Sequence, residues 1–213
     1  MSPTAPLRAA ASLGLSLSLA LAALVTVRND VPRVDQFGEI VNAHDGSVVK
    51  FDGTYFMYGT VYENCTQHGT QCEGPCGYSP NTYALYTSYD LQSWAVQSYD
   101  VLPAVDRDNR NVNYWMPYVG FNKLTKKYAM QFWSGHCGFA KPCAEIAFSY
   151  SPYGPFSNVT TVALAGTPSS QMGFFVDDDG SAYIKYNTVG PDQHHNVEKL
   201  TPDWSASTQV PYN

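Results

Sequence analysis

Apolar and polar residues alternate along most of the chain with the period of two that is typical of half-buried β-strands. The alternation is clearest in three segments that each follow a short polar turn and begin with a tyrosine, at residues 55–58, 128–133 and 183–186. The turn before the first segment contains Asp52-Gly53, a pair that favours a tight hairpin. After residue 28, no segment has a convincing helical period. The pattern therefore predicts an all-β fold built from hairpins.

A second kind of segment alternates with these hairpins. It is a strand that ends in a polar turn and an aromatic residue, and it occurs at residues 84–94, 146–156 and 197–204. Hairpin and closing strand thus recur three times, which is typical of the four-stranded blades of a β-propeller. A β-sandwich with similar hairpins is the alternative. Because propellers close with roughly four to eight blades, three units predict a partial propeller and a truncated chain.

Composition narrows the possible functions. Charged residues make up only 14% of the 213 residues, whereas the chain contains 16 Tyr, 16 Gly and 14 Pro, which suits short strands and turns. The formal net charge of -6 disfavours nucleic acid as a partner, because few basic side chains could neutralise phosphates. Low charge and many aromatic rings favour a neutral polar ligand instead.

The N-terminal segment has the pattern of a targeting signal. Arg8 precedes a nearly unbroken apolar run at residues 9–27, and Ala20-Leu21-Ala22 offers a small-residue cleavage site. We expect residues 1–28 to be a signal peptide, with an uncleaved signal-anchor as the alternative. Residues 29–213 are then the partial propeller. The protein is accordingly expected to be secreted, or anchored in a membrane with this domain facing the lumen or the exterior.

The cysteines agree with an oxidising compartment. They fall in two loops, with Cys65, Cys72 and Cys76 in one and Cys137 and Cys143 in the other. Disulfides are favoured over a zinc site, which would need paired C-x-x-C units. We predict a Cys137–Cys143 bridge and one bridge within the first loop. Asn64-Cys65-Thr66 and Asn158-Val159-Thr160 fit the pattern for N-glycosylation.

Residues that face the central funnel should recur at a similar position before each hairpin tyrosine, because the innermost strand of every blade begins there. This position falls on Asp45, on Pro117-Tyr118 and on Gln171. Polar groups that converge in a concave, aromatic-lined site are the usual mark of a binding site. The three positions therefore form one predicted site, although they lie far apart in sequence.

Neighbouring residues extend this predicted site. His44 is expected to orient Asp45 or to bind a hydroxyl group of the ligand, with a purely structural hydrogen bond as the alternative. Trp115, Tyr118 and Trp133 are candidate platforms for a ring of the ligand, with packing in the core as the alternative.

Several stretches resemble glycoside hydrolase family 43, whose members are five-bladed β-propellers. They are the His-Asp-Gly start and hairpin at residues 44–56, the S-x-D-L-x-x-W segment at 88–94, the S-P-x-G-P-F segment at 151–156 and the F-x-D-D-D-G-x-x-Y hairpin at 174–183. The first and third of these are most similar to the branch that contains exo-β-1,3-galactanases.

The resemblance implies an inverting glycosidase for polysaccharides that contain galactose, arabinose or xylose. Such an enzyme needs a general base to activate water and a general acid to protonate the leaving oxygen. By position, Asp45 matches the base. Gln171 stands where the family has an Asp that tunes the acid, so it keeps the hydrogen bonding and lacks the charge.

The resemblance places the general acid beyond Asn213, so we expect the 213-residue chain to be inactive by itself. A non-catalytic carbohydrate-binding propeller is the alternative function. No cofactor is required, no metal-binding motif is evident, and no nucleotide loop or nucleophile elbow is present. Some propellers of this family hold a structural calcium ion in the central channel, so calcium remains an option.

The other acidic residues are expected to have structural roles. Glu145 and Glu198 lie in closing strands, which should face away from the funnel. Five aspartates are expected to be turn residues: Asp90, Asp177, Asp178, Asp179 and Asp203.

Overall fold

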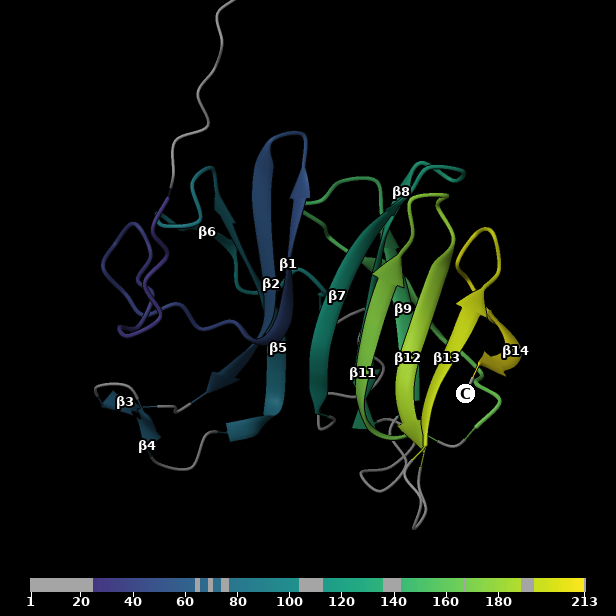
Figure 1. Cartoon of the computed structure of the whole chain (residues 1–213). Helices are drawn as coiled ribbons and strands as arrows, with labels where there is room; N and C mark the ends of the chain where they lie inside the picture. Colours follow the sequence, from purple (N-terminus) through teal and green to yellow (C-terminus); the bar gives the residue numbers. More distant parts are fainter. Residues whose placement is uncertain are drawn as a thin grey trace, which may run out of the picture.

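The computed structural model describes residues 25–63, 66–68, 71–73, 77–103, 113–135, 143–166, 168–188 and 194–212. Every regular element in these ranges is a β-strand (Figure 1). Blade 1 consists of β1 (His44–Phe51), β2 (Thr54–Glu63), β5 (Gly77–Ser88) and β6 (Ala95–Ser98). Blade 2 consists of β7 (Tyr114–Asn122), β8 (Lys127–Ser134), β9 (Cys143–Ser149) and β10 (Ser157–Thr161). Blade 3 consists of β11 (Pro168–Val176), β12 (Ala182–Thr188), β13 (His195–Leu200) and β14 (Ser207–Tyr212).

Each blade is an antiparallel sheet in which neighbouring strands follow one another along the chain. A short ribbon of β3 (Thr66–His68) and β4 (Gln71–Glu73) is inserted between β2 and β5 of blade 1. The first strands of the blades lie side by side, with β7 next to both β1 and β11. The sheets are therefore arranged as successive propeller blades, each with its first strand innermost (Figure 1). This confirms the predicted propeller fold and excludes the β-sandwich.

All three predicted hairpins are present, and polar turn residues close them. Asp52 and Gly53 both have positive φ angles, 45° and 86°, as a two-residue turn with a right-handed strand twist requires. In blade 2 the side chain of Asn122 accepts hydrogen bonds from the backbone N–H groups of Leu124 and Thr125. In blade 3 the turn at residues 177–181 is closed by a bond from the N–H of Gly180 to the carbonyl of Asp177.

The closing strands end as predicted, in a polar turn followed by a buried aromatic ring. Trp94, Phe156 and Trp204 occupy this place in blades 1, 2 and 3, and all three are buried. Asp90 accepts hydrogen bonds from the backbone N–H groups of Ser93 and Gln92, which lower its pKa to about 2. Asp90 thus has the turn role that the sequence predicted.

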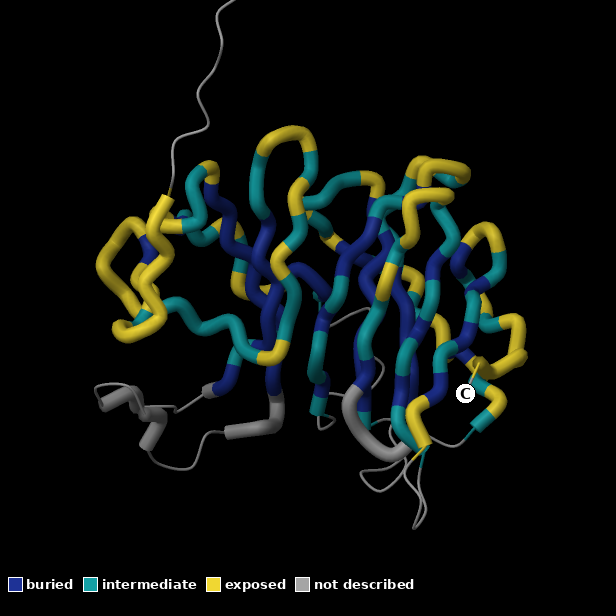
Figure 2. The backbone as a smooth tube through the Cα atoms, in the orientation of Figure 1, coloured by how far each residue is buried: buried dark blue, intermediate teal, exposed yellow. Residues whose placement is uncertain are grey.

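The core lies between the blades. One apolar cluster fills the space between blades 1 and 2, and it includes Tyr58, Leu85, Met130 and Phe132. A second cluster lies between blades 2 and 3 and includes Ile146 and Trp204. Buried residues occupy the middle of the strands, whereas exposed residues gather at the turns (Figure 2). Burial of these faces against one another is the main force that holds successive blades together.

The segment before β1 also contributes to packing. This segment covers part of the outer face of blade 1. Asp35 forms a parallel bridge with Trp94, and Val41 and Ala43 pack against the cluster of Met57 and Tyr86.

Several expectations concern residues outside the described ranges. Most of the expected signal or anchor at residues 1–28 lies outside the described part, which begins at residue 25. Within the described part, no helix is long and apolar enough to span a bilayer. Cys143 is disulfide-bonded, whereas Cys65, Cys76 and Cys137 lie outside the described residues. The cysteine pairing therefore stays a prediction.

The contact between β7 and β11 gives a test of blade packing. A Cβ atom on Gly120 would lie 2.8 Å from the side chains of Phe174 and Val176, and the ring of Phe174 is braced edge-on against Trp204. We expect Gly120→Ala to lower the free energy of unfolding by about 1–3 kcal/mol, because the two blades must move apart. Urea unfolding of the purified chain measures this.

Gly173 provides the matched control, since a Cβ atom there would meet nothing within 4 Å. Gly173→Ala should change the free energy of unfolding by no more than about 0.5 kcal/mol. Equal effects of the two substitutions would contradict the packing of β7 against β11.

Candidate functional site

Asp45 is an exposed carboxylate at the start of β1, where the strand is bulged. The pairing register with β2 shifts between His44 and Ser47, and Asp45 has a φ of 56°. Aspartate is among the few residues that tolerate this left-handed conformation. Gly46 is required beside it, because a Cβ atom there would lie 1.7 Å from the carbonyl oxygen of Tyr58. The bulge therefore fixes where the carboxylate sits, as bulges next to functional sites often do.

The same irregularity recurs in the innermost strands of the other blades. The register shifts between Trp115 and Tyr118 in β7, where Met116 has a φ of 54°, and between Pro168 and Met172 in β11. Met116, rather than Pro117-Tyr118, is thus the structural counterpart of Asp45. The sequence count placed this position one residue later, because the turns differ in length: Lys50 pairs with Tyr55 five residues on, whereas Phe121 pairs with Tyr128 seven residues on.

Gln171 lies in the part of β11 where the register shifts, and the structure describes its backbone but not its side chain. Its backbone belongs to the first strand of blade 3. Its role opposite Asp45 stays a prediction.

Tyr62 is a site residue that the sequence analysis missed. Its hydroxyl donates a hydrogen bond of 2.7 Å to Oδ2 of Asp45, and its ring lies 4.9 Å from the ring of His44. Its place follows from the strand pairing. His44 pairs with Thr60, so the end of β2 that contains Tyr62 lies beside the start of β1 that contains Asp45. Tyr62 orients the carboxylate and leaves Oδ1 without a hydrogen bond from the described residues.

Asn42 holds Tyr62 in place. The Asn42 amide donates to the carbonyl of Tyr62 at 3.0 Å, and the N–H of Tyr62 donates to Oδ1 of Asn42 at 3.2 Å. The N–H of Asn42 in turn donates to the hydroxyl of Tyr86. Asn42 therefore positions the residue that orients Asp45.

Tyr118 brings blade 2 to the same place. Burial raises the pKa of the Tyr118 phenol, and the negative charge of Asp45 raises it further, so this phenol lies within electrostatic reach of the carboxylate. The hydroxyl of Ser47 donates to the carbonyl of Pro117 at 3.1 Å and ties the two bulges together. Tyr118 stays protonated near neutral pH and can serve as a hydrogen-bond donor.

His44 is half-buried next to Asp45 and Tyr62. Burial lowers the pKa of its imidazole, and the charge of Asp45 offsets this only in part. The ring is therefore neutral at pH 7, with one nitrogen that donates and one that accepts a hydrogen bond. This combination suits a sugar hydroxyl.

The two tryptophans differ in how far they are buried. Trp133 is only 3% exposed and packs in the cluster between blades 2 and 3, so its ring presents no face to a sugar. Trp115 is half-buried and packs against the same cluster, and its backbone carbonyl accepts a hydrogen bond from the hydroxyl of Tyr83. Trp133 is therefore packed in the core, whereas part of the Trp115 side chain is accessible to solvent.

Glu145 and Glu198 lie in the third strands of their blades, away from the innermost strands. Glu145 is buried in β9. Glu198 is fully buried in β13, where it accepts hydrogen bonds from the N–H of Ala165 and from the hydroxyls of Tyr186 and Ser207. Its place between strands of blade 3 agrees with the structural role expected for it.

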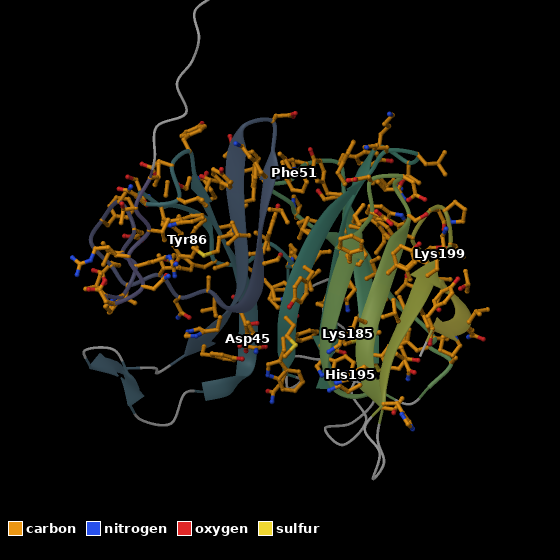
Figure 3. The ribbon with its side chains drawn as sticks, in the orientation of Figure 1. Asp45, Phe51, Tyr86, Lys185, His195 and Lys199 are labelled. Atoms are coloured by element: carbon orange, nitrogen blue, oxygen red, sulfur yellow. The ribbon has the colours of Figure 1, made fainter. Side chains whose placement is uncertain are left out.

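Figure 3 shows how the labelled residues lie along the blades. Asp45 is at the end of blade 1 opposite Phe51, which precedes the β1–β2 turn. His195, at the start of β13, lies at the same end of blade 3 as Asp45 does in blade 1. No group of three or more His, Cys, Asp or Glu residues in the described ranges is placed to hold a metal ion.

These features define a β-propeller whose innermost strands carry polar residues at one end. Solved structures of glycoside hydrolase family 43 have this fold. A β-1,3-galactosidase of that family matches with a TM-score of 0.66 and 25% identity, over 85% of this chain and 37% of its own. The exo-β-1,3-galactanase from Clostridium thermocellum matches with a TM-score of 0.68 and 20% identity, over 85% and 39%.

The exo-β-1,3-galactanase from Phanerochaete chrysosporium, whose structure contains galactose, matches with a TM-score of 0.67 and 22% identity, over 83% and 39%. The chain thus resembles family 43 galactanases in fold, as its sequence predicted, and it spans less than half the length of these three proteins. No family model and no curated protein matches the sequence.

The environment of His44 gives a testable titration. Its pKa should lie below 6.5, because burial disfavours the imidazolium, and Asp45→Asn should lower it further by removing a favourable charge. The unfolded chain then binds the proton first, so stability should fall as the pH drops from 6.5 through the pKa of the folded state. Nuclear magnetic resonance of the ring protons measures both pKa values.

Asp178→Asn is the control. It removes the same charge from an exposed turn after β11 in blade 3, far from His44. It should leave the titration of His44 unchanged. A pKa of His44 at or above 6.5, or one that is indifferent to Asp45→Asn, would contradict the described site.

Proposed function

We propose that the chain forms the general-base side of a sugar-binding funnel of the family 43 type. The proposed reaction is the inverting hydrolysis of O-glycosidic bonds in polysaccharides that contain galactose, arabinose or xylose. The observation that carries this proposal is the exposed Asp45 carboxylate, held by Tyr62 at the bulged start of an innermost propeller strand. The likeness in fold to galactanases supports the class of substrate.

The geometry suits a general base. Tyr62 binds Oδ2 of Asp45, so Oδ1 can accept a proton from a water molecule as that water attacks the anomeric carbon. The leaving oxygen needs a proton from a separate acid. Because Glu145 and Glu198 are buried within their blades, neither is proposed for that role.

The neighbours of Asp45 supply binding groups. Neutral His44 can donate to one sugar hydroxyl and accept from another. The protonated phenol of Tyr118 adds a donor from blade 2, and the accessible part of Trp115 adds apolar surface. These groups come from two blades, so a sugar bound here would contact both.

A non-catalytic carbohydrate-binding propeller is the second candidate. Gln171, at the position of the family's tuning Asp, favours it, because an amide retains hydrogen bonding to a sugar and cannot adjust the acidity of a partner by charge. Both candidates share the same binding residues. They differ only in whether bound sugar is cleaved.

The shared part is tested by calorimetric titration of the chain with galactose and with β-1,3-galactobiose. In the absence of turnover, Oδ1 of Asp45 can accept a hydrogen bond from a sugar hydroxyl in place of water. Asp45→Asn should therefore weaken binding about tenfold or more, because hydrogen bonds to a charged group contribute about 1.5–3 kcal/mol. Asp178→Asn, which changes the same charge far from the site, should bind as the unaltered chain does. Equal affinity of the two variants would mean that Asp45 does not contact the bound sugar.

Cleavage of the bound oligosaccharide, which only the enzyme would perform, is measured as release of galactose. We expect the 213-residue chain to bind without turnover. Hydrolysis that disappears in Asp45→Asn would favour the enzyme and contradict the expected inactivity, whereas hydrolysis that persists in this variant would exclude Asp45 as the base.

A further inference from the structure

The outer edge of blade 2 carries an exposed asparagine in a glycosylation pattern. β10 is the outermost strand of this blade, and among the described strands it pairs only with β9. Asn158 and Thr160 are both exposed on β10 and belong to the pattern Asn158-Val159-Thr160. The side chain that would be modified is therefore accessible on the folded protein, which is the first condition for a glycan at this place.

A bulge turns Asn158 outward. Ser157 pairs with Phe148 and Thr160 pairs with Ile146, so Asn158 and Val159 together stand opposite one residue of β9. Val159 packs against the cluster between blades 1 and 2, and Asn158 has a φ of 56°. Most residues are destabilised in this conformation by about 1–2 kcal/mol, whereas asparagine tolerates it. The bulge thus selects asparagine and directs it to solvent.

The carboxamide of Asn158 has no role in the core. Its Nδ2 donates to the hydroxyl of Ser157 at 3.2 Å, in an exposed position. The hydroxyl of Thr160 lies 3.4 Å from the carbonyl oxygen of Asn158, also at the surface. Attachment of a large group to Nδ2 would therefore displace no buried contact.

A groove begins beside Asn158. It has a volume of about 270 Å³, and its lining includes Lys127, Phe148, Tyr150 and Ser151. Tyr150 is 78% exposed, and the Lys127 ammonium lies 5.2 Å from the centre of its ring. An exposed ring with polar groups around it suits the apolar face and the amide of an N-acetylated sugar.

We propose that Asn158 carries an N-linked glycan whose first N-acetylglucosamine lies in the groove beside Phe148 and Tyr150. In the transfer, Nδ2 of Asn158 bonds to C1 of an oligosaccharide carried on a lipid diphosphate. The bond from C1 to the diphosphate oxygen breaks, the lipid diphosphate leaves with the electron pair, and the amide loses one proton. The proposal requires entry into the secretory pathway, as expected for residues 1–28, and is independent of the proposed function.

The glycan would also protect the sheet. An unpaired outer strand is a template for edge-to-edge association of chains. A bulky, hydrated group on the exposed side of β10 hinders the approach of a second edge. A glycan at this position would therefore reduce association of chains through the edge of blade 2.

The test expresses the full chain in cultured eukaryotic cells, once with its own N-terminus and once behind the leader of a secreted protein. Both the secreted and the retained fractions are treated with an amidase that removes N-glycans in ¹⁸O-labelled water, and the peptides are analysed by mass spectrometry. We expect labelled aspartate at residue 158 in most molecules. Thr160→Ala should abolish it, and Thr161→Ala, at an exposed neighbour outside the pattern, should leave it intact.

Unmodified Asn158 in the chain that carries the added leader would overturn the proposal, whether or not the protein is secreted. Thr160→Ser keeps the pattern and should keep the modification, which guards against a folding defect in Thr160→Ala. Peptide mapping separates this site from Asn64, which lies outside the described residues.

The place of the first sugar is tested by the rate at which the amidase removes the glycan from the native protein. Tyr150→Ala should raise this rate about two- to tenfold, because the loss of an aromatic contact frees the sugar. Tyr89→Ala, which removes an equally exposed ring from blade 1, should leave the rate unchanged. Equal rates in the unaltered protein and both variants would mean that the first sugar does not lie in the groove.

Discussion

Face-to-face packing of neighbouring blades is the constraint on which the rest of the structure depends. Apolar clusters between blades 1 and 2 and between blades 2 and 3 keep β1, β7 and β11 side by side. A polar contact supports the first of these, since the hydroxyl of Tyr58 in blade 1 donates to the carbonyl of Pro152 in blade 2. Residues at the starts of the innermost strands can form one site only while this packing holds.

Local geometry then converts blade packing into a site. The bulge in β1 directs Asp45 outward, and the close approach of Gly46 to the backbone of Tyr58 leaves no room for a side chain there. Asn42 fixes Tyr62, and Tyr62 fixes the carboxylate, so the functional group is held by the segment before β1 as well as by β2. Hydrogen bonds thus orient the carboxylate although Asp45 itself is exposed.

Much of the fold could be predicted from sequence, because hairpins and closing strands have short-range signals. Asp52-Gly53 marks a turn by its own conformational preference, and Trp94 and Trp204 follow polar turns that recur in the sequence. The site was only partly predictable. The alternating pattern does not reveal that the turn between Phe121 and Tyr128 is longer than the turn between Lys50 and Tyr55, so the counterpart of Asp45 was placed one residue late. The contact of Tyr62 depends on pairing across the whole β1–β2 hairpin.

The central claim is that blade packing places the Tyr118 phenol of β7 within electrostatic reach of the Asp45 carboxylate of β1. A titration of Tyr118 by nuclear magnetic resonance, in the unaltered chain and in Asp45→Asn, tests this contact most directly. The account predicts a pKa above the ordinary value of 10.0 in the unaltered chain and a lower pKa in the variant, since one of the two causes of the shift is removed. The same pKa in both proteins would mean that the two blades do not bring these residues together.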